Sequence, residues 1–80
     1  MTLYEIRETT RNFLSKFLRS AEFDEDEDLF MAGLINSLFA MQLVLFVEQE
    51  FNIKVENDDL QYENFNTLNA ISYLVMEKQG

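Results

Sequence analysis

The stretch that decides the fold reads Asp28-Leu29-Phe30-Met31-Ala32-Gly33-Leu34-Ile35-Asn36-Ser37-Leu38. It runs from an acidic segment, through a glycine that suits a turn, into residues 38–47, which are apolar apart from Gln42. We therefore expect a helix to begin at Asn36 or Ser37. Serine is a common N-cap, and a helix N-terminus also favours a phosphate because its N–H groups are unpaired and its dipole is positive there. Ser37 is thus either a plain cap or a residue that carries a phosphodiester.

The stretch resembles the attachment-site motif of acyl and peptidyl carrier proteins. The resemblance is carried by Leu29-Phe30, by Gly33-Leu34 and by Asn36-Ser37-Leu38. In that family the serine hydroxyl carries 4′-phosphopantetheine, so the resemblance implies that Ser37 is the attachment site. Residues 50–55 resemble the end of the family's second helix, and residues 64–74 its last helix. The chain departs from the family at Asn36, where an acid is usual.

Composition favours a small helical domain. The chain has 80 residues, of which 48% are hydrophobic, with no proline and only two glycines. This length fits one domain, spanning 1–80, and so few helix breakers favour helices. The resemblance implies an all-α fold, a small four-helix bundle of the acyl-carrier-protein type. It has three longer helices, a short third helix and a long loop after the first.

Charge and missing residue types exclude several functions. The formal net charge is −9, which argues against binding to nucleic acid or to an anionic membrane surface. Cysteine and histidine are absent, which excludes disulfides, thiolate nucleophiles and histidine-based acid–base or zinc sites. We therefore expect that the protein is not an enzyme. Thioester chemistry would need a thiol from an attached group, because the chain has no cysteine. No signal peptide is visible and residues 38–47 are too few to span a bilayer, so we expect a cytoplasmic protein.

The N-terminal third predicts a helix followed by an acidic loop. Thr2 and Glu5 fit a capping box, and the helix is expected to end near Arg19 or Ser20. The residues expected on its inner face are Leu3, Ile6, Phe13, Leu14, Phe17 and Leu18, and those expected on its outer face are Glu5, Arg7, Glu8, Arg11, Lys16 and Arg19. The five acids of residues 24–28 predict a solvated loop that does not pack. A calcium loop is disfavoured, because Leu29 and Ile35 stand where an EF-hand needs glycine and glutamate.

The second helix is expected to end near Phe51, with a core face made of Met41, Val44, Val47 and Phe51. Its other side is unusually apolar for a surface helix, which suggests a partner-facing patch. The resemblance implies that partner enzymes read this helix. We predict the following partner-binding residues: Asn36, Leu38, Phe39, Gln42, Leu45 and Glu48. Only Glu48 among them is charged, so we expect recognition through apolar contacts at Leu38, Phe39 and Leu45.

Two shorter segments complete the chain. Asn57 is the expected cap of a short helix, which Leu60 and Tyr62 would anchor. Asn66 or Thr67 is the expected cap of the last helix, which we expect to fray after Met76. Its predicted core stripe is Leu68, Ile71, Leu74 and Val75. Tyr73 is left open between the core and the surface.

The resemblance implies a carrier rather than a catalyst. A phosphopantetheinyl transferase would modify Ser37 from coenzyme A with Mg²⁺, and a loading enzyme would place an acyl or aminoacyl group on the arm's thiol. Dehydrogenases or synthase modules would then act on the tethered group. We expect a monomer, because a carrier docks with several partners in turn. The alternative from a different class is a small helical interaction adaptor, for which Ser37 would be only a cap.

The cargo is the least constrained expectation. The segment Asn36–Val44 resembles discrete carriers of hydroxymalonyl, methoxymalonyl and aminomalonyl extender units, which serve polyketide and antibiotic biosynthesis. We rank this extender-unit cargo first, mainly because Asn36 stands in place of an aspartate. The alternatives are a D-alanyl or other aminoacyl carrier and a fatty-acid carrier.

Overall fold

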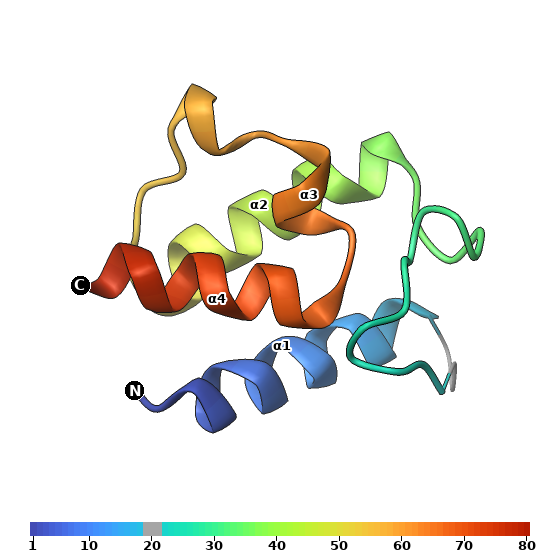
Figure 1. Ribbon diagram of the computed structural model, residues 1–80, viewed down its shortest axis with the longest axis horizontal. Helices are drawn as coiled ribbons and strands as arrows, with labels where there is room; N and C mark the ends of the chain where they lie inside the picture. Colours follow the sequence, from blue (N-terminus) through green and yellow to red (C-terminus); the bar gives the residue numbers. More distant parts are fainter. Residues whose placement is uncertain (19–21) are drawn as a thin grey trace.

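The computed structural model describes residues 1–18 and 22–80 and is helical within them. The longer helices are α1 (Leu3–Leu18), α2 (Ser37–Phe51) and α4 (Leu68–Gln79), with a 3-10 turn, η1 (Asn57–Asp59), and a one-turn helix, α3 (Tyr62–Phe65), between α2 and α4. In Figure 1, α1 and α4 lie side by side, α2 lies behind α4, and α3 sits above it. This arrangement confirms the predicted all-α bundle. The single-domain prediction stays a prediction.

The first helix begins as predicted. The Thr2 backbone N–H donates to Glu5 Oε1 at 2.8 Å and the Glu5 N–H donates to Thr2 Oγ1 at 3.1 Å, which completes the capping box. The predicted end at Arg19 or Ser20 lies outside the described residues. Phe17 is half exposed, which corrects its predicted place in the core, while Ile6 and Leu14 are fully buried.

The core face of α2 is rotated from the predicted one. Leu43, Val44, Val47 and Phe51 are buried, whereas Met41 is 54% exposed. Sequence pattern could not separate these faces, because α2 is apolar almost all round. Phe46 is half-buried and stacks on Phe13 of α1 with ring centroids 3.9 Å apart. Phe39 packs edge-on against Phe17 at 4.8 Å, so aromatic rings fill the contact between α1 and α2.

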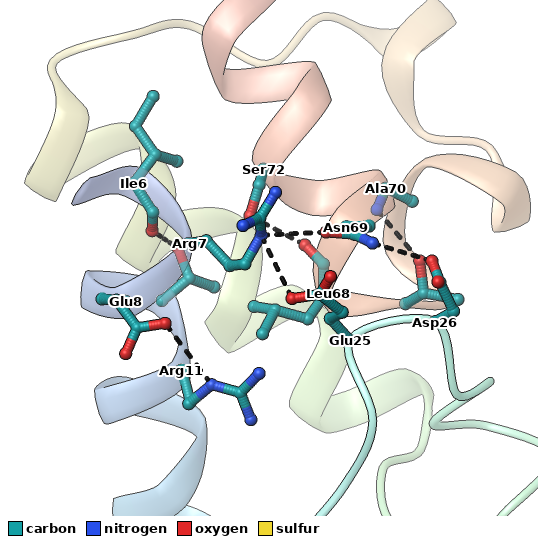
Figure 2. Close-up of polar contacts among 12 residues, drawn as sticks. Ile6, Arg7, Glu8, Arg11, Glu25, Asp26, Leu68, Asn69, Ala70 and Ser72 are labelled. Carbon is teal, nitrogen blue, oxygen red and sulfur yellow. Dashed lines mark hydrogen bonds and ion pairs between the residues drawn. The ribbon is translucent and has the colours of Figure 1, made fainter. Parts of the chain in front are cut away.

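The acidic loop is held against the bundle, and the prediction of a loop that does not pack is wrong. In Figure 2 the Asn69 side chain of α4 lies between Arg7 and Asp26. Its Oδ1 accepts from Arg7 Nε at 3.0 Å, and its Nδ2 donates to Asp26 Oδ1 at 2.8 Å. The Asn69 backbone N–H donates to the Glu25 carbonyl at 2.9 Å, and Glu25 pairs with Arg7 at 3.5 Å. Arg7 and Arg11 therefore face the loop rather than open solvent, since Arg11 donates to the Phe23 carbonyl.

The third segment differs from prediction in its caps and anchors. Glu56, not Asn57, precedes η1 as its cap, and its N–H donates to Asp59 Oδ2 at 2.8 Å. Leu60 and Tyr62 are largely exposed, and the buried anchor is Phe65 of α3. Lys78 of α4 forms an ion pair with Asp59.

The last helix matches its predicted start and core. Thr67 caps α4 by accepting from the Ala70 N–H at 2.9 Å, and the predicted stripe of Leu68, Ile71, Leu74 and Val75 is buried. Tyr73 is exposed. The helix continues to Gln79, so the predicted fraying after Met76 is wrong. The ion pair of Lys78 with Asp59 ties this last turn to η1.

Candidate functional site

Asn36, and not Ser37, caps helix α2. Asn36 has extended backbone angles and its Oδ1 accepts the Phe39 N–H at 2.9 Å, while Ser37 is the first helical residue. The reading of Ser37 as a plain cap is therefore corrected. Its side chain is exposed at the positive end of a 15-residue helix, beside backbone N–H groups of the first turn. An exposed hydroxyl in this position is free to carry an anionic group.

The loop before Ser37 is organised around the backbone carbonyl of the buried Leu29. The Leu29 carbonyl accepts from both the Leu34 N–H at 2.9 Å and the Ile35 N–H at 3.2 Å, and the Leu29 and Ile35 side chains are buried. Gly33 has a φ of 75°, the left-handed region that other residues resist, which confirms the predicted turn. The loop thus delivers the chain to Asn36 in a fixed position.

An apolar groove of about 210 Å³ lies beside Ser37. It runs between α2 and the segment that contains α3. Its lining residues are Phe30, Ser37, Ala40, Met41, Val44, Leu60, Gln61, Tyr62 and Phe65. Met41, Leu60 and Tyr62 are exposed, which the sequence did not predict. All three line this groove.

Asp28 connects the wall of this groove to the loop. One carboxylate oxygen accepts the Met31 N–H at 2.9 Å, and the other accepts from the Tyr62 hydroxyl and from Asn66 Nδ2 at 3.3 Å. The Tyr62 hydrogen bond, followed by that of Met31, lowers the pKa of Asp28, and the same contact raises the pKa of Tyr62. Sequence reasoning missed this contact, because nothing in the spacing of residues 28 and 62 indicates it.

Two kinds of comparison now bear on the site. Residues 8–75 match the protein family described as "Phosphopantetheine attachment site". The chain belongs to this family of carrier proteins. It is 34% identical over 74 residues to a D-alanyl carrier protein of Streptococcus suis, covering 91% of this chain and 94% of that protein. It is 38% identical over 64 residues to one of Streptococcus uberis, covering 80% and 81%. A third, from Streptococcus equi subsp. zooepidemicus, is 43% identical over 54 residues, covering 68% of each chain.

Family membership confirms the predicted carrier, its covalent 4′-phosphopantetheine and its non-catalytic role. When attached, this group supplies a terminal thiol, which a chain without cysteine lacks. The residues present fit it. The Ser37 hydroxyl is exposed and is not the cap of α2, and the helix N-terminus favours the negative charge of a phosphodiester.

The predicted partner-binding residues of the carrier occupy different places. Leu38 and Leu45 are 75% and 56% exposed, and Gln42 is also exposed. Phe39 is half-buried against Phe13 and Phe17, and Asn36 is engaged as the cap. Glu48 accepts the Val55 N–H at 2.9 Å, so it holds the carrier's own loop. Leu38, Gln42 and Leu45, together with the exposed Asn36, therefore make up the accessible part of the predicted surface.

Among the helices in residues 1–18 and 22–80, none combines the length and the apolar composition that a bilayer-spanning segment needs. Within those same described parts, no three acidic side chains are grouped so that they could hold a metal ion. The Asp28 carboxylate accepts from the Tyr62 hydroxyl and the Asn66 side-chain amide.

Proposed function

We propose that Ser37 carries the phosphopantetheine and that the carrier holds a D-alanyl group as its thioester. The observation that carries this proposal is the similarity, over 91% of the chain, to a protein named D-alanyl carrier protein. The geometry supports Ser37 as the attachment residue, because it is the exposed first residue of α2 and leaves the capping role to Asn36. A phosphopantetheinyl transferase and a loading enzyme are the partners that this function requires.

The expectation of a polyketide extender unit, ranked above the D-alanyl cargo from the sequence, depends mainly on Asn36, and the capping hydrogen bond gives that residue another explanation. Asparagine and aspartate are about equally good N-caps, so Asn36 is accounted for by the hydrogen bond to Phe39. The residue then carries no information about the cargo. We therefore rank the D-alanyl cargo above a polyketide extender unit, and we expect the carrier to act in the cytoplasm, where coenzyme A is available.

The first experiment is intact mass after incubation with coenzyme A, Mg²⁺ and a broad-specificity phosphopantetheinyl transferase. We expect a gain of one phosphopantetheinyl group in the natural chain and none in Ser37→Ala. A gain that persists in Ser37→Ala would move the attachment site elsewhere. No gain in the folded natural chain would favour the adaptor, with the apolar side of α2 as its site.

The second experiment tests the cargo on the primed chain. A D-alanine-activating ligase with ATP is compared for D-alanine, L-alanine and L-serine, and a glyceryl-loading enzyme is tested in parallel. We expect a D-alanyl mass increment that hydroxylamine removes, since hydroxylamine cleaves thioesters. Efficient glyceryl loading without D-alanyl loading would instead support the extender-unit carrier.

A further inference from the structure

A second groove, the aromatic groove, runs between α1 and α2, on a different face of α2 from the groove beside Ser37. It has a volume of about 290 Å³. Its lining residues are Phe13, Phe17, Gln42, Leu45, Phe46 and Gln49. None of the six is charged, although the chain has a formal net charge of −9. The groove is therefore an uncharged strip on an acidic molecule.

The α1 wall of this groove continues from the core to the surface through aromatic rings. Phe13 stacks on Phe46 with ring centroids 3.9 Å apart, and Phe17 follows at 5.0 Å from Phe13. Phe13 and Phe46 are half-buried, whereas Phe17 is 50% exposed. Leu45 faces the same groove from α2 and is largely exposed. Contiguous exposed apolar side chains of this kind mark interaction sites.

The α2 wall presents a stripe with the spacing of helix–helix contacts. Leu38, Gln42, Leu45 and Gln49 follow one another at intervals of four, three and four residues, and all four are exposed. Such spacing places them on one face of α2, as in the seam of a coiled coil. The two walls are thus an apolar and glutamine stripe on α2 and an aromatic pair, four residues apart, on α1. A third helix could pack between them.

We propose that the aromatic groove receives one amphipathic helix of the loading enzyme, and that Phe17 of α1 determines carrier specificity together with Leu45 of α2. The inference rests on the proposed carrier function, since the enzyme must approach Ser37. From Gln42 to Gln49 the groove is about 10 Å long, or two turns of a docked helix. Side chains at positions i, i+3 or i+4, and i+7 of that helix would fill it.

Charge favours an uncharged partner face over a second copy of this chain. A homodimer would bring together two chains that each have a formal net charge of −9, and their repulsion opposes association. A partner face rich in lysine and arginine would find no carboxylate on the walls of the groove. An apolar face needs no such partner, and its burial against Phe17 and Leu45 removes exposed apolar surface from water.

The position of the groove favours the loading enzyme. Gln42 and Leu45 belong to the predicted partner-binding surface, which begins at Leu38 beside Ser37, so the groove extends that surface onto α1. A transferase that primes many carriers has to recognise features around the serine that they share. A loading enzyme has to discriminate between carriers, and Phe17 lies outside the attachment motif.

The first test is the affinity of the unmodified chain for the D-alanine-activating ligase and, in parallel, for the glyceryl-loading enzyme, measured by surface plasmon resonance. We expect Phe17→Gln to weaken binding to the loading enzyme by about tenfold, because an aromatic anchor is lost. The matched control is Tyr73→Gln, at an exposed aromatic residue of α4 that does not line the groove. Circular dichroism checks that both variants are folded. Equal affinities of the two variants would overturn the proposal.

The second test leaves every aromatic ring in place. Gln42→Glu puts a carboxylate on the wall of the groove, and we expect about tenfold weaker binding because docking would bury that charge without a partner. The same change at the exposed last residue of α4, Gln79→Glu, is the control and should leave the affinity unchanged. Unchanged or tighter binding of Gln42→Glu would refute the uncharged partner face.

The third test identifies the occupant. Photoreactive p-benzoylphenylalanine is placed at position 17, the complex with the loading enzyme is irradiated, and the cross-linked peptide is sequenced. We expect a peptide of the enzyme with apolar residues at helical spacing, and no cross-link from the same group at position 73. A cross-link to a second carrier chain would replace the enzyme by a homodimer. A peptide without helical spacing would refute the docked helix.

These outcomes are distinguishable from failure of the proposed function. If the glyceryl-loading enzyme binds through Phe17 and the D-alanine-activating ligase does not bind, the groove proposal holds and the D-alanyl cargo is wrong. If neither enzyme binds the natural chain, the groove proposal is overturned. Priming of Ser37 with coenzyme A still decides the attachment site in both cases.

Discussion

The Asn36 side chain accepts the backbone N–H of Phe39 at 2.9 Å, and this bond makes Asn36 the cap of α2. The adjacent Ser37 is consequently the first residue of the helix, with its hydroxyl available for modification. The cap and the attachment residue are thus two different neighbours, and the two roles can be separated by substitution.

Substitutions at the two positions should differ in stability. Asn36→Ala removes the cap and should lower the free energy of unfolding by about 1 kcal/mol. Ser37→Ala should change it by less than about 0.5 kcal/mol, since no cap is lost. Urea unfolding followed by circular dichroism measures both. A larger loss in Ser37→Ala than in Asn36→Ala would contradict the assignment of the cap.

Asp28 should make stability depend on acid pH. Its pKa is lowered in the folded chain, chiefly by the Tyr62 hydroxyl, so its contribution is present above its unfolded pKa of about 3.9 and is lost as pH falls through the folded value. The melting temperature of the natural chain should therefore decrease when the pH is lowered below about 4. Asp28→Asn should be less stable near neutrality and lose less on acidification.

The control for this pH dependence is Asp58→Asn, at an exposed position of η1. Asp59, whose pKa is lowered by the Lys78 ammonium, contributes an acid-dependent loss of the same sign in every one of these chains. The comparison therefore depends on the difference between variants. Parallel melting profiles for the natural chain and Asp28→Asn would count against the Tyr62 contact.

Partner binding should depend on the exposed leucines of α2. Leu45→Ala should weaken binding to the loading enzyme by about tenfold, because apolar contacts and not charges are available there. Binding should change little between low and high salt. Surface plasmon resonance measures both, with Met76→Ala on α4 as the control. A steep loss of affinity with salt would show that charge dominates recognition instead.

The side-chain hydrogen bonds of Asn69 should stabilise the acidic loop. Asn69→Ala removes the side-chain bonds to Arg7 and Asp26 and should cost about 1–2 kcal/mol. Asn12→Ala is the matched control, because it makes the same change at an exposed position of α1 and gains the same helix propensity. Urea unfolding and amide exchange in residues 24–28 report the effect. Equal stability of the two variants would mean that the loop is held by other contacts.

The sequence predicted well where a local pattern sets the structure. The Thr2–Glu5 capping box, the Gly33 turn and the core stripe of α4 each depend on neighbours within one or two turns, and all three are found. The core face of α2 could not be predicted, since apolar residues on all sides give no preferred direction. The burial of Leu43 and the exposure of Met41 are set by the other helices.

The sequence by itself determined that this is a small all-α carrier with a serine at the start of its second helix, because composition, breakers and the motif around Ser37 are local properties. Only the tertiary structure decided that the acidic loop is anchored, by Asn69 at one end and by Tyr62 and Asn66 at the other. Those contacts join residues 34 to 43 positions apart, and side-chain hydrogen bonds at such separations leave no periodic signal in a single sequence.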